Sequence, residues 1–212
     1  MTALRPSKII GIGRNYVAHA KELGNEMPAV PIIFFKPPTS LIGDGDTIRL
    51  PGVSQRVEFE AEIGVVIGSR VRDLGPAEAV RAIAGYTCVN DVTCRDLQKE
   101  DGQWGRAKGF DTFCPAGPRV AQGLDWRDLE IICRVNGLER QRARATDMHF
   151  PIPDLVSFLS GIMTLEPGDL ISTGTPAGVA HGMKPPRYVQ PGDVVEMGIT
   201  GLGVQKNRVV SR

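Results

Sequence analysis

The sequence lacks several features that would assign it to a specialised class of protein. Its four cysteines form no Cys-x-x-Cys pair, so buried, reduced thiols are more natural than disulfides, with zinc binding a remote alternative. Lys and Arg (25) balance Asp and Glu (24), and no basic run is interleaved with aromatic residues, which argues against a nucleic-acid partner. No apolar run approaches membrane-spanning length, and residues 1–6 lack the apolar core of a signal peptide. We therefore expect a cytoplasmic protein with neither a nucleic-acid nor a membrane partner.

What is present suits one hydrophobic core. Hydrophobic residues make up 42% of the 212 residues and nothing divides the chain, so we expect a single domain over residues 1–212. Pro-Gly turns at 166–169 and 190–193 each lead into an aliphatic run, as strands after tight turns do. Further strands are expected near residues 8–13, 31–35, 47–50, 57–67, 84–90, 129–136 and 203–210, and helices at 76–84 and 153–163. The pattern predicts an α+β protein with more strand than helix.

Two glutamates carry the first chemical signal. Glu60 and Glu62 lie in the strand-like run of residues 57–67, and alternate residues of a strand face the same side, with Cα atoms ~6–7 Å apart. Two carboxylates held together repel one another unless a cation neutralises them, and Mg²⁺ or Mn²⁺ prefers such oxygen ligands. The alternative is that Glu58, Glu60 and Glu62 form the solvated face of an edge strand.

Asp91 adds a third carboxylate at the end of a second apolar run, residues 84–90. We expect that strand to continue into a helical turn, which would place Asp91, Arg95 and Gln98 on one face and let Arg95 clamp Asp91. Further along, Lys108 precedes a glycine in a stretch that otherwise favours a strand. The third carboxylate favours a divalent-metal site over a solvated strand face.

His19 and Glu22 form the second chemical signal. Asn15 can cap a short helix and Gly24 can end it in the left-handed conformation, which puts His19 and Glu22 three residues apart on one face. Glu22 could then hold one ring nitrogen of His19 and leave the other free to act as a base. In isolation, such a pair is more often an exposed polar face.

Four segments, in order along the chain, resemble the fumarylacetoacetate hydrolase family. They are the Glu-x-Glu strand with the Gly-Val-Val-Ile-Gly that follows it, Asn-Asp-Val-Thr-x-Arg-Asp-Leu-Gln at 90–98, Lys-Gly-Phe-Asp-Thr-Phe-Cys-Pro at 108–115, and Thr-Gly-Thr-Pro-Ala-Gly-Val at 173–179. The resemblance runs from about residue 11 to residue 210 and is strongest to small members of the family. It also includes the Gly-x-Asn-Tyr start of the segment that carries His19 and Glu22.

The resemblance implies a fold, a cofactor and a set of site residues. The fold would be a mixed β-sandwich roll, usually a homodimer, and residues 1–212 would form a single catalytic domain. Mg²⁺ or Mn²⁺ would be held by Glu60, Glu62 and Asp91, and a lid at about residues 14–29 would carry His19 and Glu22 as a catalytic dyad. The remaining site residues would be Lys108, which is catalytic, and Arg14, Arg95, Gln98 and Thr175, which bind the substrate or support the site.

The function that the resemblance implies is metal-dependent hydrolysis of a carbon–carbon bond in a 2,4-dioxo acid. An acylpyruvate such as fumarylpyruvate or acetylpyruvate would give pyruvate and a carboxylic acid. The same site could decarboxylate oxaloacetate, or isomerise or decarboxylate unsaturated dicarboxylates of aromatic catabolism, and the sequence does not choose among these acids. A metal-stabilised binding protein without catalysis is the alternative from another class.

Overall fold

Strands dominate the fold. The computed structural model describes residues 4–211, so residues 1–3 and 212 of the expected domain lie outside the described residues. The strands are β1 Ile9–Gly13, β2 Ile32–Lys36, β3 Leu41–Ile42, β4 Thr47–Leu50, β5 Val57–Glu58, β6 Ala61–Ile67, β7 Ile83–Asn90, β8 Thr93–Cys94, β9 Cys114–Ala121, β10 Glu130–Val135, β11 Leu138–Arg144, β12 Leu170–Ser172, β13 Val194–Ile199 and β14 Gly203–Ser211. The α-helices are α1 Val17–Glu22, α2 Pro76–Ala79, α3 Arg95–Asp101, α4 Gly105–Lys108 and α5 Ile152–Ile162. Short 3-10 helices are η1 Pro38–Ser40, η2 Val80–Ala82, η3 Trp126–Asp128, η4 Ala145–Asp147 and η5 Ala180–Gly182.

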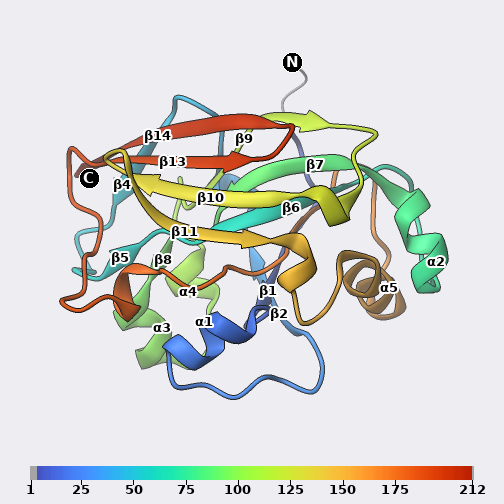
Figure 1. Cartoon of the computed structure of the whole chain (residues 1–212), viewed down its shortest axis with the longest axis horizontal. Coiled ribbons are helices and arrows are strands. Elements are labelled where there is room, and N and C mark those ends of the chain that lie inside the picture. The colour runs from blue at the N-terminus through green and yellow to red at the C-terminus, as the bar shows by residue number, and fades with distance from the viewer. Residues whose placement is uncertain (1–3, 212) are drawn as a thin grey trace.

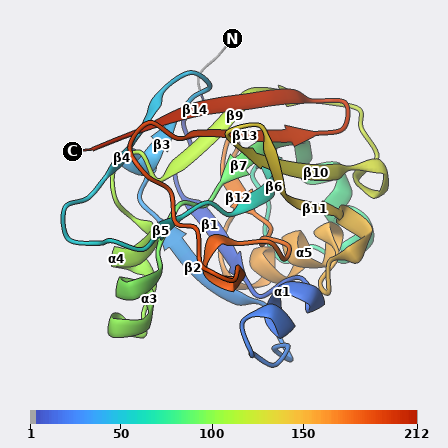
Figure 2. The ribbon, with the colours of Figure 1, turned by 60° about the vertical axis from the view of Figure 1, so that its left-hand side comes forward.

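Two mixed sheets pack face to face. One has the strand order β2-β1-β12-β6-β7-β9-β3 and the other the order β11-β10-β13-β14-β4. The strands β10, β13 and β14 lie against β6, β7 and β9, as Figure 1 and Figure 2 show. Alternate side chains of both sheets meet between them, for example Ile63 and Val65 of β6 and Ile131 and Cys133 of β10, all fully buried. The prediction of a strand-rich α+β protein is confirmed.

Both Pro-Gly turns form as the sequence predicts. Gly168 and Gly192 have φ of 88° and 96°, a conformation that favours glycine at this turn position. The carboxylates of Asp169 and Asp193 each accept a hydrogen bond of 2.8 Å from the backbone N–H three residues earlier. Each turn leads directly into a strand, β12 after the first and β13 after the second.

The helices lie outside the two sheets. α3 packs on α4, and these two lie with α1 toward the lower left of Figure 1, whereas α2 packs on α5 at the right. No helix within residues 4–211 is long and apolar enough to cross a membrane.

The local structure differs from the sequence prediction at three of the predicted site residues. Residues 57–67 are two strands rather than one, because β5 pairs with β8 while β6 pairs with β7, and Glu60 lies between them. Asp91 directly follows β7 and α3 begins only at Arg95, so Asp91 is not on that helix. Lys108 ends the short helix α4 and is not part of a strand.

Candidate functional site

Glu60, Glu62 and Asp91, the carboxylate cluster, meet at one edge of the β6–β7 pair. Ala61 at the start of β6 is paired with Asn90 at the end of β7, so the residues beside them share that edge. The backbone N–H of Asp91 donates to the Glu60 carbonyl at 2.9 Å, and that of Glu60 donates to Asn90 Oδ1 at 3.1 Å. One oxygen from each carboxylate lies within 4.8 Å of the other two, and all three residues are buried.

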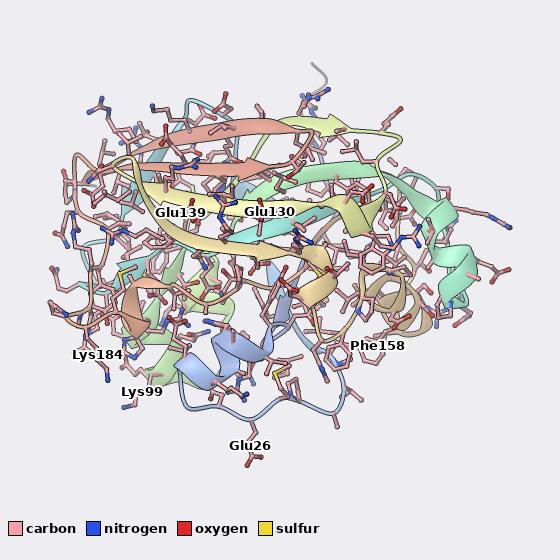
Figure 3. All side chains as sticks on the ribbon, viewed as in Figure 1. Glu26, Lys99, Glu130, Glu139, Phe158 and Lys184 are labelled. Carbon is pink, nitrogen blue, oxygen red and sulfur yellow. The ribbon has the colours of Figure 1, made fainter. Side chains whose placement is uncertain are left out.

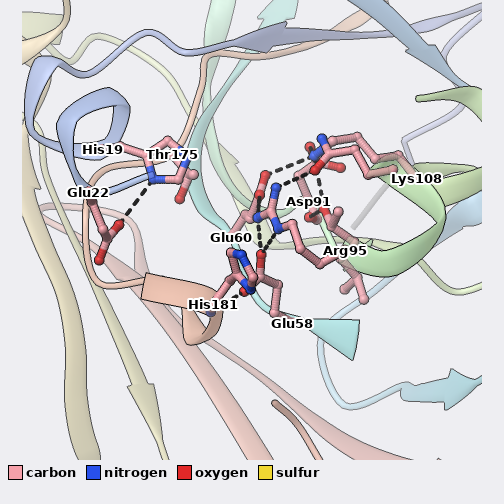
Figure 4. A network of polar contacts seen from close by, with 12 residues as sticks. His19, Glu22, Glu58, Glu60, Asp91, Arg95, Lys108, Thr175 and His181 are labelled. Carbon is pink, nitrogen blue, oxygen red and sulfur yellow. Dashed lines mark hydrogen bonds and ion pairs between the residues drawn. The ribbon is translucent and has the colours of Figure 1, made fainter. Parts of the chain in front are cut away.

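Two buried lysines contact this cluster, and Figure 4 shows one of them, Lys108, beside Glu60 and Asp91. Lys108 Nζ donates to Glu60 Oε2 at 2.8 Å and also to Asp91 Oδ2. Lys36, at the end of β2, places its Nζ 2.5 Å from Asp91 Oδ1. Burial would raise the pKa of Asp91, but Lys108 and Lys36 outweigh it and hold that pKa below its usual value. Burial would likewise lower the pKa of Lys108, but Asp91 and Glu60 raise it, so the lysine stays protonated.

Glu62 is held by neutral donors. Its Oε2 accepts hydrogen bonds from the Ser172 hydroxyl at 2.5 Å and from the Gly174 N–H at 2.8 Å. Burial, followed by repulsion from Asp91 and Glu60, raises the pKa of Glu62 to about 8. Because its direct hydrogen-bond donors are neutral, Glu62 favours its protonated form at pH 7 in the metal-free protein.

Arg95 contacts Glu58 and Glu60, so the predicted clamp of Arg95 on Asp91 is wrong. Its Nη2 lies 2.5 Å from Glu60 Oε1, and its guanidinium also donates to Glu58 and to Gln98. Arg95 is the first residue of α3, and from there its side chain extends to the junction of β5 and β6. Lys36 and Lys108 contact Asp91 instead. Glu58 is fully buried like its two alternate neighbours, so the interpretation of a solvated strand face is also wrong.

His19 and Glu22 lie on one face of α1, as predicted. His19 Nδ1 is 3.3 Å from Glu22 Oε2, while Glu22 Oε1 accepts the Gly178 N–H at 3.0 Å. Gly182 packs so closely on the same side chain that a Cβ there would lie 2.4 Å from the Glu22 carboxyl group. The helix is therefore docked on the loop after β12, and His19 is only 6% exposed.

Asn15 does not cap α1, and that part of the prediction is wrong. The N-cap residue is Tyr16, whose side chain makes no capping hydrogen bond. The Asn15 amide instead donates to the carbonyls of Phe150 and Thr173, at 3.1 and 2.8 Å, and accepts the Phe150 N–H at 2.8 Å. Its fully buried side chain thus ties together three segments that are distant in sequence. Gly24 adopts φ of 69° just after the helix, as predicted.

Thr175 lies on the loop after β12 and is tied to the strand that carries the glutamates. Its hydroxyl accepts from Gln141 Nε2 at 2.8 Å and donates to the Ala61 carbonyl at 3.1 Å. Gln141 Oε1 accepts the Ala61 N–H at 3.0 Å. Gln141 comes from β11 in the other sheet, so it braces the residue between Glu60 and Glu62 from across the sandwich. Nothing in the sequence distinguished it from the polar residues around it.

A cavity of about 430 Å³ brings most of the predicted site residues together. The predicted residues on its wall are Arg14, His19, Glu60, Glu62, Arg95, Gln98, Lys108 and Thr175. Asp91 and Glu22 lie behind the wall, where Asp91 contacts Lys108 and Glu22 contacts His19. Segments far apart in sequence, including α1, α3, α4 and the loop after β12, therefore enclose one space.

Phe34, Trp104 and His181 also lie on this wall, and no sequence pattern marks them as site residues. Phe34 and Trp104 pack edge to face with centroids 5.4 Å apart, and Lys108 Nζ lies 4.8 Å from the Phe34 centroid. His181 donates its backbone N–H to Glu58 at 2.7 Å and lines the cavity from η5. An aromatic residue in a predicted strand is most simply read as core, and a single histidine in a loop has no spacing that marks it.

The donor set fits a hard divalent cation. The carboxylate cluster offers oxygen ligands alone, converging within 4.8 Å in a buried place. Each carboxylate oxygen has two lone pairs, so an oxygen that accepts a hydrogen bond from Lys108 or Lys36 can still coordinate an ion. Mg²⁺ and Mn²⁺ accept such ligands and keep positions for water or substrate, which the cavity could supply.

Comparison with known proteins identifies the family to which this fold belongs. Residues 8–210 match the family model described as fumarylacetoacetate (FAA) hydrolase, C-terminal. An uncharacterized protein of Methanocaldococcus jannaschii is 49% identical over 206 residues, which cover 97% of this chain and 84% of that protein. The crystal structure of 2-hydroxyhepta-2,4-diene-1,7-dioate isomerase from Mycobacterium marinum is 44% identical with a TM-score of 0.89, covering 99% of this chain and 76% of that one. Fumarylacetoacetate hydrolase from Exiguobacterium antarcticum is 42% identical with a TM-score of 0.91 and the same coverage, 99% and 76%.

Proposed function

The chain belongs to the fumarylacetoacetate hydrolase family, and on that premise we propose that it is a divalent-metal-dependent hydrolase of 2,4-dioxo acids. The substrate would be an acylpyruvate such as fumarylpyruvate or acetylpyruvate, and cleavage of its carbon–carbon bond would give pyruvate and a carboxylic acid. The observation that supports this best is the placement of the His19–Glu22 pair and the carboxylate cluster around one cavity.

The residues around the carboxylate cluster have distinct roles in this proposal. Glu60, Glu62 and Asp91 would hold Mg²⁺ or Mn²⁺, which when bound supplies Lewis-acid polarisation of the oxo acid. Lys108 keeps a protonated ammonium at the cavity floor, where it stabilises negative charge that develops on the substrate oxygens. Arg95 orients Glu60 through their ion pair.

His19 would be the general base. Its Nδ1 faces Glu22, so Nε2 remains for a water molecule in the cavity. The water gives a proton to Nε2 while its oxygen attacks the C4 carbonyl carbon of the dioxo acid. The C3–C4 bond then breaks, its electron pair passes to C3 as the pyruvate enolate, and protonation at C3 completes pyruvate. Thr175 and Gln98, on the same wall, would position the acid.

A substrate panel tests this function. Acetylpyruvate, fumarylpyruvate and oxaloacetate are assayed with Mg²⁺ or Mn²⁺ and again after exhaustive chelation. We expect cleavage of at least one acylpyruvate that is abolished by the chelator and restored by added metal. Turnover that survives complete chelation would refute the metal assignment, and no turnover of any of these acids would favour a binding protein without catalysis.

Isomerisation of an unsaturated dicarboxylate is the second candidate. It is favoured by the similarity to a protein named 2-hydroxyhepta-2,4-diene-1,7-dioate isomerase. The same base would move a proton between carbons, and no water would attack. Mass analysis of the products separates the two reactions, because isomerisation conserves the substrate mass whereas hydrolysis gives two fragments.

We also propose that the protein is a homodimer, as the family resemblance implies. Light scattering after gel filtration should give twice the chain mass of 22.9 kDa. A monomeric mass at micromolar concentration would contradict this.

A further inference from the structure

We infer that Gln141 is a positioning residue for the metal site, because its amide holds both the strand of the glutamates and the loop that anchors Glu22. The inference rests on the proposed function, since it takes Glu60 and Glu62 as ligands of a divalent cation. Gln141 lies on β11 and is not on the cavity wall. It would act through the backbone that it holds, without touching the metal or the substrate.

The strand β6 extends past its neighbour β12 at the end where the glutamates lie. β12 ends at Ser172, which is paired with Gly64, so residues 61–63 have no strand beside them on that side. Ala61 is fully buried, and a buried backbone N–H or C=O without a hydrogen-bond partner costs free energy. The partners of Ala61 therefore help to determine the course of the chain between Glu60 and Glu62.

Side chains from two other segments take the place of the missing strand. Gln141 Oε1 accepts the Ala61 N–H at 3.0 Å, and Thr175 Oγ1 donates to the Ala61 carbonyl at 3.1 Å. Gln141 Nε2 donates to Thr175 Oγ1 and to the Pro176 carbonyl, both at 2.8 Å. Gln141 is only 1% exposed, so these bonds form away from competing solvent. One amide thus ties the backbone between the two glutamates to the loop after β12.

The same loop supports the proposed general base. Gly178 on this loop donates its N–H to Glu22 Oε1 at 3.0 Å, and Glu22 contacts His19. Gly178 packs so closely on β11 that a Cβ there would lie 2.0 Å from the Arg140 carbonyl oxygen and 3.2 Å from Gln141 Cγ. Gln141 therefore lies between the proposed metal ligands and the support of the base, and links the position of one to that of the other.

An irregularity in β11 turns Gln141 towards the interior. Gln141 is paired with Cys133 of β10, but the next residue, Arg134, is paired with Glu139, which leaves Arg140 without a partner in this pair of strands. Alternate residues of a regular strand share a face, so Gln141 would otherwise lie on the outer face with the exposed Glu139. Bulges of this kind re-aim side chains and are frequent beside active sites. Here the bulge buries the side chain that holds β6.

Metal selectivity is the property that this positioning would control. Mg²⁺ requires nearly ideal octahedral geometry with oxygens at about 2.0–2.1 Å, whereas Ca²⁺ accepts irregular arrangements at about 2.3–2.6 Å. Two ligands on a loosened backbone can still bind Ca²⁺, but they meet the stricter requirement of Mg²⁺ less well. Loss of the Gln141 amide should therefore weaken Mg²⁺ binding more than Ca²⁺ binding, whereas a general loss of stability would weaken both alike.

Calorimetric titration of Mg²⁺ and of Ca²⁺ into Gln141→Met tests the inference. Methionine is close to glutamine in size but supplies neither the acceptor for Ala61 nor the two donors for the loop. We expect the ratio of Mg²⁺ affinity to Ca²⁺ affinity to fall about tenfold, as when residues that orient metal ligands are removed. Hydrogen exchange of residues 17–22 should also become faster, because the loop holds them through Glu22.

Thr175 provides a second pair of variants on the same network. Thr175→Val removes the hydroxyl that links Gln141 to the Ala61 carbonyl, so it should lower the affinity ratio in the same direction. Thr175→Ser keeps the hydroxyl and should restore the ratio. If Gln141→Met does not fold, this pair carries the test, and equal ratios in Thr175→Val and Thr175→Ser would overturn the inference.

Gln205→Met is the matched control. Gln205 is a fully buried glutamine on β14 of the same five-stranded sheet, and its amide donates to Asn207. Its replacement should lower the stability but leave the affinity ratio and the exchange of residues 17–22 unchanged. An equal fall of both affinities in Gln141→Met, or the same fall of the ratio in Gln205→Met, would overturn the inference.

Acylpyruvate cleavage measured on the same samples separates this inference from the proposed function. A selective fall of the affinity ratio in Gln141→Met, with no cleavage of any acid by the unmodified protein, would retain the role of Gln141 and reject hydrolysis. Metal-dependent cleavage combined with an unchanged ratio in Gln141→Met would retain hydrolysis and reject the role of Gln141.

Discussion

Lys36 and Asp91 form an ion pair with both side chains fully buried, Nζ lying 2.5 Å from Oδ1. Lys36 comes from β2, the edge strand of the seven-stranded sheet, and Asp91 follows β7 near its centre. The other oxygen of Asp91 accepts from Lys108. Burying a charged lysine costs free energy unless an anion lies beside it. The Asp91 carboxylate supplies that anion, and Lys36 in turn orients the carboxylate.

Replacing this lysine should destabilise the metal-free protein. Lys36→Met removes one of the two lysine ion pairs of Asp91 and leaves the pair with Lys108, and we expect the free energy of unfolding to fall by about 3 kcal/mol. Mg²⁺ should recover part of the loss, because the ion takes over the compensation of the buried carboxylate. Urea unfolding with and without Mg²⁺ measures both effects, with Lys184→Met at an exposed lysine as the control (Figure 3). A loss that Mg²⁺ leaves unchanged would argue against a metal beside Asp91.

Glu62 and Glu60 should respond oppositely to neutralisation. Burial raises the pKa of Glu62 to about 8, so Glu62→Gln should keep or slightly increase the stability of the metal-free protein at pH 7 while weakening Mg²⁺ binding at least tenfold. Glu60→Gln should cost about 3 kcal/mol, because it leaves the buried charges of Lys108 and Arg95 short of a partner. Urea unfolding measures the stability of both variants, and calorimetric titration measures their affinity for Mg²⁺. Full Mg²⁺ affinity in Glu62→Gln would remove it from the ligand set.

Asp169 should make stability depend on pH outside the active site. Burial raises the pKa of Asp169, but hydrogen bonds from Lys8, the Glu166 N–H and Ser7 outweigh burial and lower it. The unfolded chain therefore binds this proton more readily, so ionised Asp169 stabilises the fold above about pH 3.9, and the stabilisation is lost as the pH falls through the lower folded pKa. Asp169→Asn should cost about 2 kcal/mol at pH 7 and much less at pH 2. Equal losses at both pH values, or the same loss in the exposed control Asp128→Asn, would contradict this.

Residues 14–29 should behave as a lid. The helix α1 has six residues, below the ~12–15 that persist alone in water, so its order depends on docking. Gly182→Ala should displace the Glu22 carboxyl group, speed hydrogen exchange of residues 17–22 and lower kcat, since a Cβ there meets Glu22 at 2.4 Å. Gly161→Ala, with open space around it, is the control. Oxalate with Mg²⁺ should slow exchange in the unmodified protein, and equal exchange with and without oxalate would count against a lid.

His19→Ala should separate hydrolysis from decarboxylation. Hydrolysis needs a base to activate water, and its loss should lower acylpyruvate cleavage by ~10²–10⁴. Loss of carbon dioxide from oxaloacetate needs no attacking water, so it should fall much less. Lys108→Met should impair both reactions, because both develop enolate charge, and Glu22→Gln should reproduce part of the hydrolytic loss. Equal losses of both reactions in His19→Ala would show that the pair serves binding or lid closure.

Much of this arrangement could be predicted from the sequence because its cause is local. Pro-Gly turns and aliphatic alternation set where β12 and β13 begin, and a three-residue spacing puts His19 and Glu22 on one helical face. Glu60 and Glu62 could be paired in the same way, because residues two apart in an extended chain stay close, even though Glu60 directly precedes β6 and only Glu62 lies within it.

The tertiary structure decided which charges meet those residues. Arg95 is four residues from Asp91 but reaches Glu60, while Lys36, 55 residues away in sequence, binds Asp91. The pairing of the strands determines such contacts. The spacing of residues in the sequence does not show which strand ends will lie side by side. Gln141 shows the same limit, because a bond across two sheets exists only once the sheets pack. Residue types and their local spacing thus determined which chemical groups are available to this protein. The packing of the sheets decided which of these groups share the cavity, because a buried charge is stable only beside an opposite charge and packing determines which one lies there.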